Sequence, residues 1–148
     1  MVDFYFDGMR QEPYEGEDVL IVSSPKVPTY DKKPEMSVYK VVEEFKKALK
    51  KNKYHLFAIN FANPDMVAHS GNLEKTIEAV EHVDKAVGEV VEESLKVNGT
   101  IFITADHGNA EELLTFPTAS FYYTTSGGNV NTDHSTIRYR YISSAISL

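Results

Sequence analysis

The sequence predicts an α/β domain with a mostly parallel sheet and helices on both faces. Short runs of apolar and β-branched residues alternate with longer segments in which apolar residues recur every three or four positions. Strands separated by helices of this length imply right-handed crossover connections and therefore parallel pairing. Polar clusters follow the second and third apolar runs, at the sheet edge where open α/β sheets bind ligands.

Three segments are expected to be strands. The first, DVLIVS at residues 18–23, is a β-branched run ended by a stretch rich in proline and serine. The second and third, YHLFAINFA at 54–62 and GTIFITA at 99–105, are nearly continuous apolar runs. This pattern is typical of strands that are buried on both faces of a parallel sheet.

Two long helices are expected between and after these strands. Ser37 is placed to cap a helix that runs through Lys50, with an apolar face of Val38, Val41, Val42, Phe45 and Leu49. A second helix runs from about Leu73 to Lys96, with an apolar stripe of Ile77, Val80, Val83, Val87, Val90, Val91 and Leu95. From about residue 114 to 135 the composition predicts loop or a short hairpin.

Composition narrows the class of protein. The chain has 148 residues and a formal net charge of −7, which fits one domain and argues against a binder of nucleic acid or anionic membranes. There is no cysteine, so disulfides and thiolate metal sites are excluded. Neither a signal peptide nor an apolar run near the length of a membrane span is visible, so we expect a cytoplasmic protein.

The first polar cluster is the segment Asn63–His69, which follows the second expected strand. Asn63 is a favourable helix cap, and Pro64 suits a first helical position. In a helical turn, Asp65 and His69 lie four residues apart on one face and can coordinate one metal ion. The alternative is an ordinary turn with a solvated aspartate and a surface histidine.

The second polar cluster, Asp106 and His107, comes directly after the third expected strand. Such a pair is costly at the end of a buried strand unless it is hydrogen-bonded, paired or metallated. Gly108 permits a sharp turn that would let the two side chains converge. The alternative is that Asp106 caps a helix formed by the following NAEELL segment.

A third element, His134 within TDHS, says little alone, because a loop histidine is usually solvated. Together the three elements match what a dinuclear carboxylate–imidazole site requires, with two metals about 3.5–4 Å apart polarising a phosphoryl group. His55 and His82 are expected to be surface histidines.

The motifs resemble those of cofactor-independent phosphoglycerate mutase, a member of the alkaline phosphatase superfamily. NFANPDMVAHSGN and ITADHGNAEELL are similar to that family's two metal-binding segments, and SSPKVPTYDKKPEMS resembles the stretch that precedes them. The resemblance covers about residues 2–135, with three motifs in the same order. It implies an alkaline-phosphatase-like α/β fold, of which this chain is a part.

The resemblance implies an isomerase of glycolysis that interconverts 3-phosphoglycerate and 2-phosphoglycerate through a phosphoserine intermediate. It implies two divalent metal ions, manganese first, with magnesium, cobalt or zinc as alternatives. Asp65, His69 and His134 would hold one ion, and Asp106 and His107 would hold the other. The complete enzyme is expected to be a cytoplasmic monomer that takes a small phosphoglycerate substrate and binds no nucleic acid or membrane.

The departures from the family concern the nucleophile and the substrate clamp. The family's nucleophilic serine, a further metal-binding aspartate and the transferase domain belong to segments that would precede Met1, and no serine of this chain matches the nucleophile's motif. We therefore expect a carboxyl-terminal portion of the enzyme that is inactive alone. Apolar surface left exposed would favour its self-association.

The chain divides into residues 1–135, the metal-binding portion, and a divergent tail at 136–148. Loss of one base from codons for the family's usual NPVPVYIV would give the observed IRYRYISS from Ile137, which suggests a frameshift. The alternative is an edge strand particular to this lineage. Resequencing decides between them, because an intact frame across residues 136–138 would contradict the frameshift.

Two other functions compete with the mutase. The chain could derive from another enzyme of the superfamily, such as a phosphopentomutase or phosphatase, because these would share the Asp and His ligands. It could also be a non-catalytic metal-binding remnant. The combination of SSPKVPTYD with NPDMVAH favours the mutase.

Overall fold

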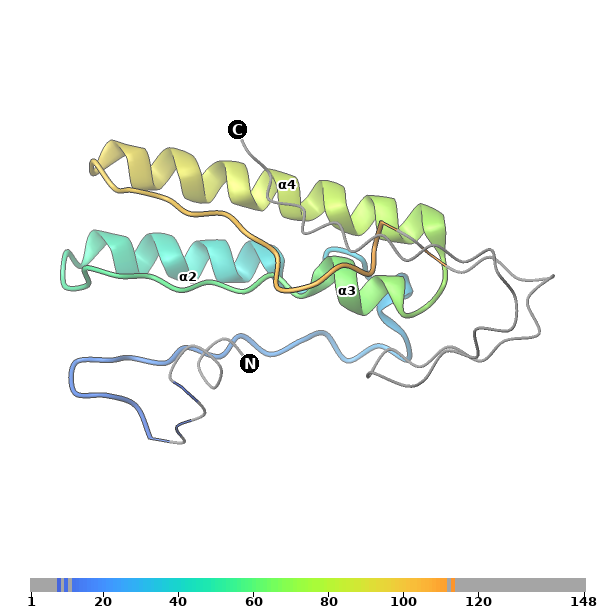
Figure 1. Cartoon of the computed structure of the whole chain (residues 1–148), viewed down its shortest axis with the longest axis horizontal. Coiled ribbons are helices and arrows are strands. Elements are labelled where there is room, and N and C mark those ends of the chain that lie inside the picture. Colours follow the sequence, from blue (N-terminus) through green and yellow to red (C-terminus); the bar gives the residue numbers. More distant parts are fainter. Residues whose placement is uncertain (1–7, 9, 11, 112, 114–148) are drawn as a thin grey trace, which may run out of the picture.

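The computed structural model describes residues 8, 10, 12–111 and 113 of the chain (Figure 1). Its helical elements are a short 3-10 helix η1 at Tyr30–Lys32, α2 at Val38–Lys50, α3 at Asn63–Ala68 and α4 at Leu73–Lys96. The two long helices therefore have the bounds expected from the sequence. His134, the loop at 114–135 and the tail at 136–148 lie outside the described residues.

Helices α2 and α4 lie side by side and run in the same direction (Figure 1). Two side-chain pairs join them at the same sequence offset of 43 residues: Tyr39 to His82, and Lys46 to Glu89. From the first pair to the second, the position advances by seven residues on α2 and by seven residues on α4, so the two helices run in the same direction. The hydrogen bond from Lys46 to Glu89 raises the pKa of the Lys46 ammonium above its usual value.

The core lies between these helices. Val38 and Val42 of α2 pack against Ala86 of α4, with partly buried Phe61, Val83 and Val90 around them. Burying one valine side chain contributes about 1.5–3 kcal/mol. The contact is therefore built from Val38 and Val42 on α2 and from Ala86 with its neighbours Val83 and Val90 on α4.

The buried stripe of α4 differs from the predicted one. Thr76, Ala79 and Ala86 are buried, whereas Ile77, Val80 and Leu95 are exposed. The helix packs on α2 and α3, and its fully buried positions carry the small side chains of Thr76, Ala79 and Ala86. The predicted stripe is therefore correct in part: Val83 and Val90 pack against the core, whereas Ile77, Val80 and Leu95 are exposed and the buried Thr76, Ala79 and Ala86 were missed.

The three expected strands are extended segments, and the described residues contain no β-strand. The segments before α2, before α3 and after α4 run in one direction, opposite to the two long helices, as in crossover units (Figure 1). No backbone hydrogen bond joins these segments within the described part of the chain. A strand needs such a ladder to a neighbour, so the predicted parallel sheet is not formed in this part of the structure.

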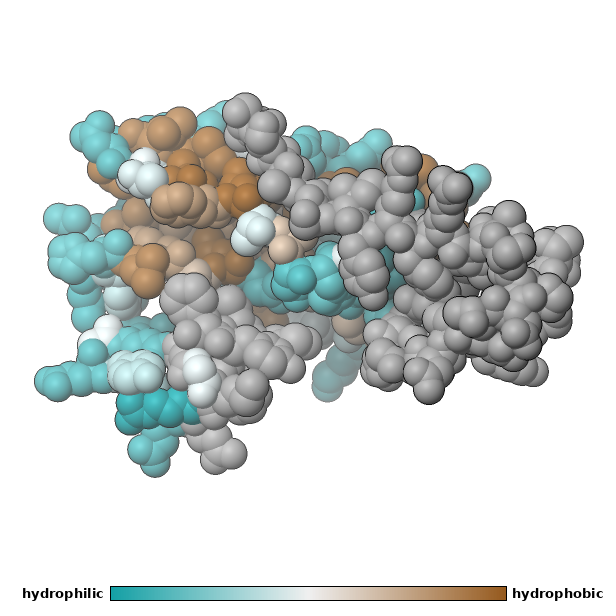
Figure 2. Space-filling model, viewed as in Figure 1, coloured by the Kyte–Doolittle hydropathy of each residue, from teal (hydrophilic) through white to brown (hydrophobic). Residues whose placement is uncertain are grey.

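Side chains of these segments are correspondingly exposed. Leu56 is 70% exposed and Phe102 is 91% exposed. Figure 2 shows apolar residues gathered over α2, α4 and the segments that lie across them. Among the described helices, none is both long and apolar enough to cross a membrane.

Two polar and aromatic contacts tie the extended segments to their neighbours. Asp18 accepts hydrogen bonds from Lys53 Nζ at 2.7 Å and from the Tyr54 hydroxyl, which joins the first segment to the second. The bond from Lys53 lowers the pKa of the Asp18 carboxyl. Phe57 packs edge-to-face on Phe45 with ring centroids 5.2 Å apart, which holds the second segment against α2.

Candidate metal site

Helix α3 carries the first pair of candidate ligands. Asp65 lies in its first turn and His69 directly follows its last residue, so the two side chains share one face. His69 Nε2 lies 3.4 Å from Asp65 Oδ1, and both side chains are partly exposed to solvent. The predicted i, i+4 arrangement is therefore present, and an imidazole nitrogen and a carboxylate oxygen face each other.

Buried residues fix the position of α3. Val67 is fully buried and Ala68 is nearly so, and the helix contacts α4. Asn63 is 3% exposed and donates a hydrogen bond from Nδ2 to the Pro34 carbonyl at 2.9 Å. Asn63 was expected to cap the helix, but Ala62 occupies the cap position and Asn63 begins the helix, with its amide used for this tertiary contact.

The cap expected at α2 differs in the same way. The helix begins directly after Ser37, as predicted, but the Ser37 hydroxyl donates to the Ser23 carbonyl at 2.8 Å and caps no helical N–H. A tertiary contact has again replaced a local one. It connects the segment before η1 to the start of α2.

The second pair of candidate ligands lies at the end of the third extended segment. His107 Nε2 is 3.7 Å from Asp106 Oδ2, and the His107 backbone N–H donates to Asp106 Oδ1 at 3.0 Å. Both side chains are well exposed. Residues 106–111 form bends and a turn, and residues 112 and 114 of the NAEELL segment, where the alternative placed a helix capped by Asp106, lie outside the described residues.

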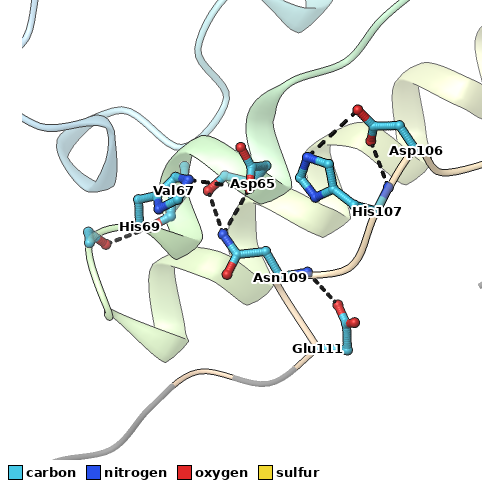
Figure 3. A network of polar contacts seen from close by, with 8 residues as sticks. Asp65, Val67, His69, Asp106, His107, Asn109 and Glu111 are labelled. Atoms are coloured by element: carbon cyan, nitrogen blue, oxygen red, sulfur yellow. Dashed lines mark hydrogen bonds and ion pairs between the residues drawn. The ribbon is translucent and has the colours of Figure 1, made fainter. Parts of the chain in front are cut away.

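Asn109 connects the two pairs, as Figure 3 shows. Its Nδ2 donates to Asp65 Oδ1 at 2.8 Å, and it lies 3.4 Å from the Asp65 carbonyl oxygen. Sequence reasoning missed this residue, because a contact between positions 44 apart leaves no local pattern. The one feature of the sequence that could have indicated a role for Asn109 is its position directly after Asp106, His107 and Gly108.

The chemistry of the donor groups suits a divalent cation, although the described part of the chain does not complete a site. Carboxylate and imidazole together favour manganese, zinc or iron, and the chain offers no thiolate. No group of three or more His, Asp or Glu side chains converges on one point among the described residues. His134, the third ligand expected beside Asp65 and His69, lies outside them.

The two other histidines differ from each other. His55 is exposed on the second extended segment, as expected. His82 is partly buried, and its Nδ1 is 2.6 Å from the Tyr39 hydroxyl, with the two rings edge-to-face. His82 was expected to be a surface histidine, and it is instead partly buried and belongs to the contact between α2 and α4.

Comparison with known proteins places these features in a family. The model of the metalloenzyme superfamily matches residues 1–138. The 2,3-bisphosphoglycerate-independent phosphoglycerate mutase of Clostridium acetobutylicum is 51% identical over 115 residues, which are 78% of this chain and 22% of the relative. The enzyme of the same name from Thermosynechococcus vestitus is 50% identical over 113 residues, 76% of this chain and 21% of the relative.

A solved structure agrees with these relatives. The crystal structure of Leishmania mexicana phosphoglycerate mutase at low cobalt concentration matches with a TM-score of 0.73 and 33% identity. The match covers 87% of this chain and 24% of that one, so the chain spans about a quarter or less of these proteins. The resemblance stated from the motifs is confirmed, and the chain belongs to the metalloenzyme superfamily.

Proposed function

We propose that this chain is the metal-ligand portion of a phosphoglycerate mutase that interconverts 3-phosphoglycerate and 2-phosphoglycerate through a phosphoserine intermediate. The observation that carries the proposal is the linked pair of Asp–His motifs. Asp65 with His69 and Asp106 with His107 come from segments that Asn109 holds together. Relatives about 50% identical over most of this chain, which bear the mutase name, support the same reaction.

In this proposal, Asp65, His69 and His134 hold one metal ion, and Asp106 and His107 contribute to the site of a second. When bound, the two ions would stabilise negative charge on the transferring phosphoryl group. The contribution of α3 is placement, because Val67 and Asn63 fix the helix that carries the first pair. Manganese is the proposed ion, with magnesium, cobalt or zinc as alternatives.

The setting of the reaction is part of the same proposal. The whole enzyme would act as a cytoplasmic monomer on a small phosphoglycerate, within an alkaline-phosphatase-like α/β fold. The extended segments and parallel helices support this fold, because they have the order and direction of crossover units. The net charge of −7 is unsuited to a nucleic-acid partner.

The metal assignment is tested by calorimetric titration of the 148-residue chain with Mn²⁺. We expect binding by the wild type and its loss in His69→Ala, because the imidazole faces the Asp65 carboxylate. His55→Ala is the matched control, since His55 is an exposed histidine on another segment. Equal binding by the His69 and His55 variants would remove the first pair from the site.

The reaction is tested on the product of the full-length gene. We expect isomerisation of phosphoglycerate and no comparable rate with phosphopentoses. A rate confined to phosphopentoses would instead assign another reaction of the superfamily. The 148-residue chain alone is expected to show no turnover, because none of its serines matches the nucleophile's motif.

A further inference from the structure

We propose that Asn109 is a positioning residue that orients the Asp65 carboxylate for metal binding. This inference rests on the proposed function, since it needs Asp65 to be a ligand. Asn109 does not itself face the metal in this role. It acts through the carboxylate that it contacts.

The contact is well suited to fixing a carboxylate. Asn109 Nδ2 is 2.8 Å from Asp65 Oδ1, and His69 Nε2 lies 3.4 Å from the same oxygen. An amide N–H can donate a hydrogen bond but cannot bind a cation. The side of the Asp65 carboxylate that faces Asn109 is therefore occupied by an uncharged hydrogen-bond donor. The hydrogen bond, drawn in Figure 3, restrains rotation of the carboxylate, so its remaining lone pairs keep a defined direction.

The backbone of Asn109 is itself held by Glu111. Its backbone N–H donates to Glu111 Oε2 at 2.9 Å. Gly108 makes this possible, because a Cβ at that position would lie 1.8 Å from Glu111 Oε1. The Glu111 carboxylate therefore folds back over Gly108 and pins the loop from which Asn109 reaches Asp65.

The same contact joins the two pairs of candidate ligands. Asn109 follows Asp106 and His107 on one loop, whereas Asp65 belongs to α3, 44 residues earlier. A change that frees Asn109 would thus loosen the carboxylate and the loop together. Hydrogen-bonding partners of metal ligands commonly change metal affinity by about 10–100-fold when they are removed.

A purely structural role predicts something different. If Asn109 only secured the loop, its removal would lower the stability of the chain and leave the affinity for metal unchanged. The two roles are separated by measuring both quantities on the same variants. Asn109→Ala removes the amide, and Asn109→Gln keeps it on a longer side chain.

The first measurement is calorimetric titration of the 148-residue chain with Mn²⁺ alone. We expect Asn109→Ala to weaken binding about 10-fold or more and Asn109→Gln to recover part of the loss. The matched control is Asn98→Gly, which removes an amide just beyond the far end of α4, where a positive φ of 57° suits glycine. The control is expected to bind like the wild type.

The second measurement is a double-mutant cycle between Asn109→Ala and Asp65→Ala. The free energy of unfolding of each variant is measured by urea unfolding in the absence of metal. We expect the two substitutions to be non-additive, because the residues contact each other directly. Additive effects would overturn the contact, and unchanged Mn²⁺ affinity in Asn109→Ala would overturn the positioning role. Failure of the wild type itself to bind Mn²⁺ would instead overturn the proposed metal site, and the inference with it.

Discussion

At the scale of single residues, Asn63 shows how a buried amide secures the base of the candidate site. It is 3% exposed, and its Nδ2 donates to the carbonyl of buried Pro34 at 2.9 Å. Within the described residues, no buried side-chain nitrogen or oxygen lacks a partner. Removing the amide would leave that carbonyl unpaired in a place with little access to water.

We expect Asn63→Ala to lower the free energy of unfolding by about 1–3 kcal/mol, the cost of a buried polar group left unpaired. Urea unfolding followed by circular dichroism measures the change. Asn60→Ala is the control, because Asn60 is exposed on the neighbouring segment and its loss should cost no more than about 0.5 kcal/mol. Equal losses at the two positions would contradict the role given to the Pro34 contact.

The residue scale is also where the sequence was least informative. The Asp–His pairs were identifiable because each lies within a few positions of chain. The roles of Asn63 and Asn109 depend on partners 29 and 44 residues away, respectively, so no local spacing indicates them. A favourable local role, such as capping by Asn63, was the natural prediction, and the tertiary contact replaced it.

At the scale of elements, α4 offers a direct test of helix formation. Gly88 lies on its exposed side, and a Cβ there would meet nothing within 4 Å. Gly88→Ala should raise the free energy of unfolding by about 0.5–1 kcal/mol, because glycine is a poor residue for a helix interior. Gly71, just before the helix, is the matched control: it has equal space but a φ of 70°.

Gly71→Ala should therefore destabilise the chain, since left-handed backbone costs a non-glycine residue about 1–2 kcal/mol. Thermal unfolding of the two variants should move the midpoints in opposite directions. A rise in both midpoints would mean that Gly71 does not hold its positive φ in solution. A fall in both would contradict the open space described around Gly88.

The bonds between Asp18, Lys53 and Tyr54 make the first extended segment sensitive to acid. The hydrogen bond from Lys53 lowers the folded-state pKa of Asp18 below the usual value of 3.8. A carboxyl with a lowered folded pKa contributes stability that is present above its unfolded pKa and is lost as the pH falls through the folded one.

Wild type should consequently lose stability more steeply than Asp18→Asn below about pH 4, near the unfolded pKa of aspartate. Near neutral pH the wild type should be the more stable of the two. Urea midpoints measured between pH 7 and pH 2.5 check this. Parallel curves for the two proteins would show that the contact is not formed in solution.

The elements also show what periodicity can and cannot predict. The bounds of α2 and α4 follow from apolar residues at steps of three and four, which are set by local chain geometry. The buried face of α4 was predicted in part: Val83 and Val90 pack on the core, but Ala79 and Ala86 were missed because alanine is only weakly hydrophobic. Strands could be predicted as extended segments, but their pairing depends on neighbours that no local pattern supplies.

At the scale of the whole molecule, the candidate site depends on how two distant segments are brought together. Helix α3 is fixed by buried residues, whereas Asp106 and His107 lie on an exposed loop that Asn109 connects to it. The candidate ligands themselves could be proposed from motifs in the sequence. The sequence could not predict that buried residues fix the first pair whereas the second pair lies on an exposed loop. This difference follows from the packing of α3 on α4.

This unequal support predicts how metal binding couples to folding. A ligand that binds the folded state alone stabilises it by RT ln(1 + [L]/Kd), about 2.7 kcal/mol at 100 times Kd. We expect Mn²⁺ to raise the melting temperature of the wild type and of His55→Ala, in proportion to the logarithm of its concentration. His69→Ala should abolish the rise, because it removes the proposed ligand that follows α3, a helix fixed by buried residues. His107→Ala should reduce it less, because its pair lies on the exposed loop. The reverse order for His69 and His107 would place the stronger metal contact on that loop.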